Sequence, residues 1–202
     1  ELLRRTQQAP NGVRLPLMWQ GQVVGSVAPV VGEALLNGCP PMGGASLEWR
    51  MPPALPGGPH TTGASLQIVT EDLSAALLLM ASTLRRLGMA GAWRDELLAV
   101  RNAQGQHLGA VERGVVRVLG IPTEAVHLVG FCQDGSLWVQ QRAFTKANDP
   151  GLWDTLMGGM ISDADTLETA LQRETWEEAG LRTDDLQDLK KMGLIEQRRP
   201  SD

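Results

Sequence analysis

The segment from Ser162 to Gly180 constrains the fold of this chain most, because its pattern predicts one well-defined helix. Asp163 or Asp165 is placed to cap the helix N-terminus. Gly180 suits the left-handed conformation that commonly ends a helix. Apolar residues recur at helical spacing and predict a buried stripe, which consists of Leu167, Ala170 and Leu171.

Three glutamates share another face of this helix. Glu174, Glu177 and Glu178 are related by steps of three and four residues, which stacks their side chains. Carboxylates placed so closely repel one another unless something compensates their charge. Mg²⁺ is a natural compensation, since it takes oxygen ligands and is often shared with substrate phosphates. Arg173 is placed to pair with Glu177 one turn further on and to hold its carboxylate.

Glutamate-rich helix faces are also common on solvated surfaces, so the surrounding sequence has to decide between the two interpretations. A short strand predicted at Trp153–Met157 ends at Gly158-Gly159, immediately before the helix. The segment from Gly159 to Leu181 resembles the Nudix box, G-x5-E-x7-R-E-U-x-E-E-x-G-U, in which U is a bulky aliphatic residue. All spacings agree, and the matching residues are Gly159, Arg173, Glu174, Glu177, Glu178, Gly180 and Leu181.

Two positions depart from the pattern of the Nudix box. Asp165 stands in place of the first glutamate and keeps the charge with a shorter reach, which leaves its part in metal binding open. Thr175 stands in place of an aliphatic residue and is expected to weaken the packing of the helix slightly.

The resemblance implies a hydrolase that cleaves a phosphoanhydride bond with Mg²⁺ or Mn²⁺. Its implied catalytic residues are Arg173 and the three glutamates. Glu174, Glu177, Glu178 and the backbone carbonyl of Gly159 would hold the metal, and one glutamate or a residue of a later loop would act as the base. Arg142 and Lys146 precede the box and are expected to contact the diphosphate; the alternative is that both are ordinary solvated cations.

A less specific resemblance covers roughly residues 70–181. It is to a Nudix subgroup related to, or fused with, thiamine pyrophosphokinase, and it implies thiamine diphosphate or its oxidised analogues as substrate. Trp138 or Trp153 would then stack on an aromatic heterocycle, although core packing explains each tryptophan equally well. The residues that carry this resemblance include Trp93–Glu96, Glu112-Arg113, His127-Leu128, Leu137–Val139, Arg142, Lys146, Pro150-Gly151 and Trp153-Asp154.

The chain is expected to be α+β, with an N-terminal α+β domain at residues 1–120 and a Nudix α/β/α sandwich at residues 121–202. The second segment is shorter than the resemblance implies, so we expect the C-terminal part of that sandwich to be missing. The N-terminal half is expected to shape the substrate pocket, to mediate homodimerisation, or to do both.

Local patterns predict the elements of both halves. The first half is expected to hold a hairpin at Leu15–Trp19 and Gln22–Val27, strands at 46–51 and 97–100, and helices at Glu71–Leu87, capped by Thr70, and at Val111–Leu119. The second half is expected to open with strands at Ala125–Cys132 and Leu137–Arg142, which flank the turn formers Asp134-Gly135-Ser136.

Composition excludes several classes of protein. The net charge of −5 argues against a nucleic-acid-binding surface. The longest apolar runs fall far short of the roughly 20 residues that span a bilayer, so we expect no membrane partner and a cytoplasmic location. Cys39 and Cys132 are expected to be free thiols, because their spacing suits neither a zinc site nor a disulfide framework.

Two alternatives to hydrolysis stay open. A Nudix fold can serve as a binding or regulatory module without turnover, and the short second segment favours this for the chain as it stands. An isomerase acting on a prenyl diphosphate is a third hypothesis, which the complete box disfavours. Release of a monophosphate would distinguish the hydrolase from both.

Overall fold

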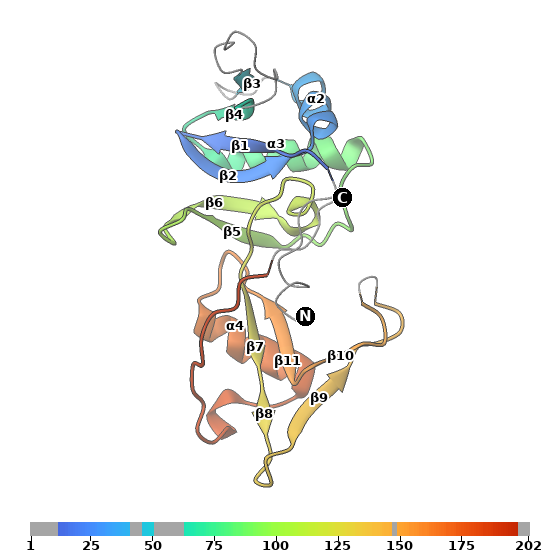
Figure 1. The fold of residues 1–202 in the computed structure, drawn as a ribbon, viewed down its shortest axis with the longest axis vertical. Coiled ribbons are helices and arrows are strands. Elements are labelled where there is room, and N and C mark those ends of the chain that lie inside the picture. Colours follow the sequence, from blue (N-terminus) through green and yellow to red (C-terminus); the bar gives the residue numbers. More distant parts are fainter. Residues whose placement is uncertain (1–11, 41–45, 51–62, 147–148, 198–202) are drawn as a thin grey trace. The chain divides into compact units, whose positions relative to one another are not determined.

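The computed structural model describes residues 12–40, 46–50, 63–146 and 149–197. Two compact units are present among them (Figure 1). One comprises the residues up to Thr123 together with 194–197, and the other spans Glu124–Gly193. No helix of the described residues is long and apolar enough to cross a membrane.

The first unit contains a four-stranded sheet in the order β2-β1-β4-β3. The predicted hairpin is confirmed: β1 (Leu15–Trp19) and β2 (Gln22–Val27) pair antiparallel. Its turn residues Gln20 and Gly21 both have positive φ, as a tight hairpin turn requires. The other two strands, β3 (Ser46–Arg50) and β4 (Ser65–Val69), pair antiparallel, and β4 runs parallel to β1.

Among the described residues, two helices accompany this sheet, α2 (Pro29–Gly38) and α3 (Leu73–Arg86). The helix predicted at Glu71–Leu87 is therefore present, but its cap is Asp72 and not Thr70. The Asp72 carboxylate accepts a hydrogen bond from the backbone N–H of Ala75 at 3.0 Å, while the Thr70 hydroxyl oxygen accepts from the N–H of Asp72 at 3.1 Å. An ionised carboxylate is the stronger acceptor for the exposed N–H groups of a first turn.

The prediction of a helix at Val111–Leu119 is wrong. The chain forms a strand, β6 (His107–Glu112), and then a short 3₁₀ turn, η1 (Arg113–Val115). β6 pairs antiparallel with β5 (Leu97–Arg101), and the buried Glu112 carboxylate accepts hydrogen bonds from the N–H groups of Arg94 and Gly114. Pairing with a strand outside the local window outweighs the helical spacing of the apolar residues.

The second unit has two small antiparallel sheets. β7 (Ala125–Leu128) pairs with β11 (Met157–Met160), and β9 (Leu137–Gln141) lies between β8 (Gly130–Phe131) and β10 (Trp153–Thr155). Each of two predicted strands is thus divided, at Val129 and at Leu156. The division lets one stretch of chain contribute to both sheets, which a local pattern does not reveal.

The predicted helix at Ser162–Gly180 starts later than expected and changes type along its length. It consists of α4 (Leu167–Glu174) and a π-helical segment, η2 (Thr175–Ala179), followed beyond Gly180 by the 3₁₀ turn η3 (Thr183–Asp185). Thr166 caps α4 through a reciprocal pair of hydrogen bonds with Thr169, so neither Asp163 nor Asp165 is the cap. Gly180 has φ 65°, the left-handed conformation that was predicted.

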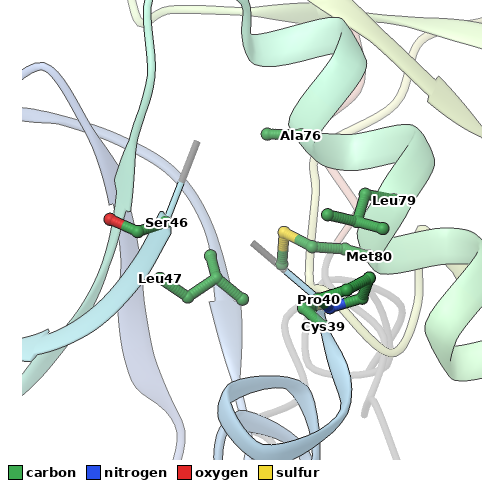
Figure 2. Close-up of a pocket in the computed structure, with 7 residues that line it drawn as sticks. All are labelled: Cys39, Pro40, Ser46, Leu47, Ala76, Leu79 and Met80. Atoms are coloured by element: carbon green, nitrogen blue, oxygen red, sulfur yellow. The ribbon is translucent and has the colours of Figure 1, made fainter. Parts of the chain in front are cut away.

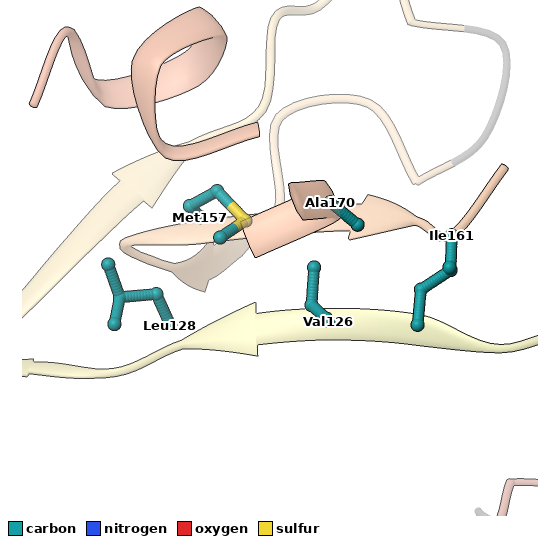
Figure 3. Close-up of a cluster of buried hydrophobic side chains, with 5 residues drawn as sticks. All are labelled: Val126, Leu128, Met157, Ile161 and Ala170. Atoms are coloured by element: carbon teal, nitrogen blue, oxygen red, sulfur yellow. The ribbon is translucent and has the colours of Figure 1, made fainter. Parts of the chain in front are cut away.

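A small apolar cluster fixes α4 against the β7–β11 sheet. Met157 and Ala170 are fully buried, and the side chains of the cluster gather between β7, β11 and α4 (Figure 3). Its members are Val126, Leu128, Met157, Ile161 and Ala170. The packing places the C-terminal half of the helix beside Gly158 and Gly159 of β11, where the candidate site lies.

Candidate active site

Gly159 lies directly against the side chain of Glu174. A Cβ atom built on Gly159 would overlap the Glu174 carboxylate group, so this close approach is open to glycine alone. The Glu174 side chain is only 13% exposed. The packing of α4 on β11 thus brings a carboxylate against the backbone of a strand.

Arg173 holds three carboxylates. Its Nη2 and Nε atoms donate to Asp165 Oδ2 at 2.7 and 3.2 Å, and its Nη1 atom donates to Glu174 Oε1 at 2.8 Å. The predicted pair with Glu177 is present at 3.5 Å, the longest of these contacts. A planar guanidinium suits this task, because its donors point in fixed and divergent directions.

Hydrogen bonds and burial shift the pKa values of three groups in the site. The hydrogen bond from Arg173 is the main cause that lowers the pKa of Asp165. Burial raises the pKa of Glu174, although the hydrogen bond and charge of Arg173 oppose that rise. Asp165 in turn raises the pKa of Arg173. A half-buried acid with a raised pKa beside a permanent cation is typical of a functional site.

Glu178 accepts hydrogen bonds from two strands, β11 and β9, which belong to different sheets. Its Oε2 atom accepts a hydrogen bond from the backbone N–H of Gly158 at 3.2 Å and another from Gln140 Nε2 at 3.0 Å. Glu174 and Glu178 therefore border two consecutive residues of β11. The π-helical turn between them widens the helix where these side chains project, and such turns are frequent at functional sites.

The donor set has the chemistry that a hard cation prefers. Three carboxylates lie on one short helical stretch, and one of them, that of Glu174, lies against Gly159. Mg²⁺ and Mn²⁺ both bind oxygen ligands. As the side chains stand, no group of three Asp, Glu, His or Cys residues in the described part of the chain is gathered tightly enough to hold a metal. In this conformation the three carboxylates accept hydrogen bonds from Arg173, Gly158 and Gln140.

Comparison with known proteins agrees with this geometry. Residues 122–201 match the NUDIX domain. Over these residues the chain is similar to the Nudix family. The match includes β7 to β11, α4 and the π-helical segment that carries Glu177 and Glu178.

Curated relatives resemble part of this chain. The chain is 34% identical over 87 residues to an uncharacterized Nudix hydrolase of Pseudomonas aeruginosa, PA4841, covering 43% of this chain and 52% of the relative. It is 33% identical over 88 residues to the uncharacterized Nudix hydrolase orf19 of Rhodococcus erythropolis, covering 43% and 48%. The chain thus spans about half the length of these relatives.

A solved structure also resembles the chain. It is DR0079 from Deinococcus radiodurans, at 26% sequence identity and a TM-score of 0.40, with 46% of this chain and 57% of that chain covered.

The two cations expected to contact a diphosphate both lie after β9. Arg142 follows directly after β9, and its Nη1 atom forms an ion pair with Asp154 of β10 at 3.3 Å. The side chain of Lys146 is exposed in the loop beyond it. Asp154 is paired in register with Gln140, so Arg142 is anchored next to the strand that supports Glu178.

Two residues of the site were missed or left open by sequence reasoning. Asp165 proves to be the main partner of Arg173, and its place at the first acidic position of the box was the available signal. Gln140 gave no signal, because it lies on a strand 38 residues before Glu178. Only the packing of the strands against the helix brings the two together.

A separate pocket in the first unit has different chemistry. It lies between α3, β3 and the end of α2 (Figure 2), and its lining residues are Cys39, Pro40, Ser46, Leu47, Ala76, Leu79 and Met80. Both cysteines are free, as predicted. Burial raises the pKa of the Cys39 thiol, which disfavours the reactive thiolate. An apolar lining of this kind does not suit a diphosphate.

Proposed function

We propose that this chain is a Nudix hydrolase that cleaves a phosphoanhydride bond of a small-molecule diphosphate and releases a monophosphate. The observation that carries the proposal is the arrangement at β11, where Glu174 lies against Gly159 while Glu178 accepts from the N–H of Gly158. The match to the NUDIX domain and the similarity to two relatives named as Nudix hydrolases support the same activity.

Glu174, Glu177, Glu178 and the Gly159 carbonyl would hold Mg²⁺ or Mn²⁺. When bound, the metal would neutralise charge on the phosphoryl oxygens and acidify the attacking water. Arg173 orients Glu174 and Glu177 through its Nη1 donor and is itself anchored by Asp165. Fixing the carboxylates beforehand reduces the reorganisation needed during the reaction.

Arg142 and Lys146 are proposed to contact the diphosphate. Arg142 forms an ion pair with Asp154, and a planar guanidinium suits the geometry of phosphoryl oxygens. Thiamine diphosphate and its oxidised analogues are the proposed substrates, in line with the resemblance to the thiamine-related subgroup. Trp138 and Trp153 are 59% and 68% exposed, which supports stacking on a heterocycle.

The wider organisation also belongs to this proposal. Residues 1–120 would form a domain that shapes the pocket or mediates a homodimer. Residues 121–202 would form part of an α/β/α sandwich. The protein would act in the cytoplasm, without nucleic-acid or membrane partners.

A second candidate is a binding module without turnover. The observation that favours it is that, in the described part of the chain, the acidic side chains are not gathered into a metal-binding group. Arg173 neutralises two of the three glutamates in this conformation.

A product assay on the chain distinguishes the two candidates. Thiamine diphosphate, its oxidised analogues, ADP-ribose and several nucleotide sugars are incubated with and without Mg²⁺. Metal-dependent release of a monophosphate supports the hydrolase, and Glu177→Gln is expected to lower it by about 100-fold. The matched control is Glu168→Gln, on the first turn of α4. Binding of a diphosphate without any product supports the module instead.

A further inference from the structure

Gln140 is the one side chain of the β8–β9–β10 sheet for which the described contacts show a hydrogen bond to a glutamate of the box. Its Nε2 atom donates to Glu178 Oε2 at 3.0 Å. The backbone N–H of Gly158 donates to the same oxygen at 3.2 Å. Both donors approach Oε2, which leaves Oε1 as the oxygen from which Glu178 would bind a cation.

The neighbouring strands fix the direction of the Gln140 side chain. In the antiparallel pairing of β9 with β10, Gln140 lies opposite Asp154, and Gln141 lies opposite Trp153. Successive side chains of a strand point to opposite faces. Gln141 accordingly bonds elsewhere, since its Nε2 atom donates to the carbonyl of Gly151 at 3.0 Å. Position 140 is thus the one of the pair that faces Glu178.

We propose that Gln140 is a positioning residue for Glu178. Its amide holds the carboxylate beside the N–H of Gly158 and leaves Oε1 as the oxygen that would bind the metal. This inference rests on the proposed function, because it assigns Gln140 a part in the same site.

The bond between Gln140 and Glu178 is exposed, so it contributes little to the stability of the fold, as is usual for polar contacts in water. Removing a partner that orients a metal ligand has a larger effect, typically 10- to 100-fold in metal affinity. A positioning role therefore predicts that metal binding and stability respond differently to the same substitution.

The test measures Mn²⁺ affinity of the full chain directly, without substrate. We expect Gln140→Leu to weaken Mn²⁺ binding about tenfold, with an unfolding midpoint close to that of the wild type. Gln140→Thr, which favours a strand, is the second variant in case leucine disturbs β9. Gln141→Leu is the matched control, and its Mn²⁺ affinity is expected to stay unchanged.

A double-mutant cycle with Glu178→Ala separates an effect through Glu178 from any other effect. Gln140→Leu is expected to cause no further loss of Mn²⁺ affinity once Glu178 is absent. The amide signal of Gly158 in the metal-free protein is a second readout. It is expected to shift in Gln140→Leu in the same direction as in Glu178→Ala.

Each result decides one of the two proposals. Unchanged Mn²⁺ affinity or an unchanged Gly158 signal in both Gln140 variants overturns the role of Gln140 and leaves the proposed function standing. The role of Gln140 is also overturned if Gln140→Leu causes the same loss of Mn²⁺ affinity in the wild type and in Glu178→Ala. If the wild-type chain does not bind Mn²⁺ at all, the proposed function fails, and the role of Gln140 fails with it.

Discussion

Arg173 and Asp165 are joined by two hydrogen bonds to one oxygen, from Nη2 at 2.7 Å and from Nε at 3.2 Å to Asp165 Oδ2. The Asp165 side chain is 14% exposed, and it also accepts hydrogen bonds from Ser162 and Thr169. Asp165 is thereby anchored before α4 begins. It fixes the guanidinium that in turn holds Glu174.

Replacing Arg173 by lysine tests this anchoring. A lysine ammonium is compact and lacks the fork that reaches Asp165 and Glu174 together. We expect Arg173→Lys to lower the free energy of unfolding by about 1 kcal/mol and turnover by at least tenfold. Urea denaturation and the product assay measure the two effects. Additive losses in Arg173→Lys and Asp165→Asn would contradict a direct coupling.

The lowered pKa of Asp165 predicts a pH dependence of stability. A carboxyl whose pKa is lower in the folded state stabilises the fold above its unfolded pKa, about 3.9, and loses that contribution as the pH falls through the folded value. The wild type should therefore exceed Asp165→Asn in stability at pH 6, and the difference should shrink toward pH 3. Denaturation curves at both values check this; a constant difference would argue against it.

Gly159→Ala tests the close approach of Glu174 to β11. The added Cβ would overlap the Glu174 carboxylate, which is the far end of a flexible side chain and can move away. We expect a modest loss of stability, about 1 kcal/mol, but a loss of Mn²⁺ binding comparable to that of Glu174→Gln. Gly12→Ala is the control, because its Cβ would meet nothing within 4 Å. Unchanged Mn²⁺ binding in Gly159→Ala would remove Glu174 from the metal site.

Met157 tests the cluster that positions α4. It is fully buried between Val126, Leu128, Ile161 and Ala170. Met157→Ala is expected to lower the free energy of unfolding by about 2–5 kcal/mol, whereas Met157→Leu, which conserves volume, should lower it by less than about 1.5 kcal/mol. Equal effects of both variants in urea denaturation would mean that packing at this position is loose.

The cap of α4 is open to a simple substitution. Thr166 Oγ1 accepts from the N–H of Thr169 at 3.2 Å, and Thr169 Oγ1 accepts from the N–H of Thr166 at 2.8 Å. Thr166→Ala is expected to lower the free energy of unfolding by about 1 kcal/mol. Thr166→Ser is expected to retain most of the stabilisation that the cap provides, because its hydroxyl can accept the same hydrogen bond. A larger loss in Asp163→Ala than in Thr166→Ala would restore Asp163 as the cap.

Elements with local causes were predictable from the sequence. The turn formers Gln20-Gly21 and Asp134-Gly135-Ser136 connect paired strands as expected, and Ser136 donates to the Asp134 carboxylate within the second turn. Gly180 ends the π-helical segment in the left-handed conformation. In each case the chemistry that decides the conformation lies within a few residues, so a short window of sequence contains it.

Elements that depend on distant partners were not predictable in this way. The stretch at Val111–Leu119 has helical spacing, but its first residues pair with β5. Trp153–Met157 was expected to be one strand, but it divides at Leu156 between two sheets. A strand needs a partner, and the partner of either stretch is separated from it by a turn or a longer piece of chain.

By itself, the sequence determined which residues are proposed to carry the chemistry, because the spacing of Gly159, Arg173 and the three glutamates is a local pattern. It did not determine how their charges are balanced. The tertiary structure decided that Asp165 anchors Arg173, that Gly159 admits the Glu174 carboxylate, and that Gln140 reaches Glu178. Hydrogen bonds are directional and act over about 3 Å, so they depend on packing that brings distant segments together.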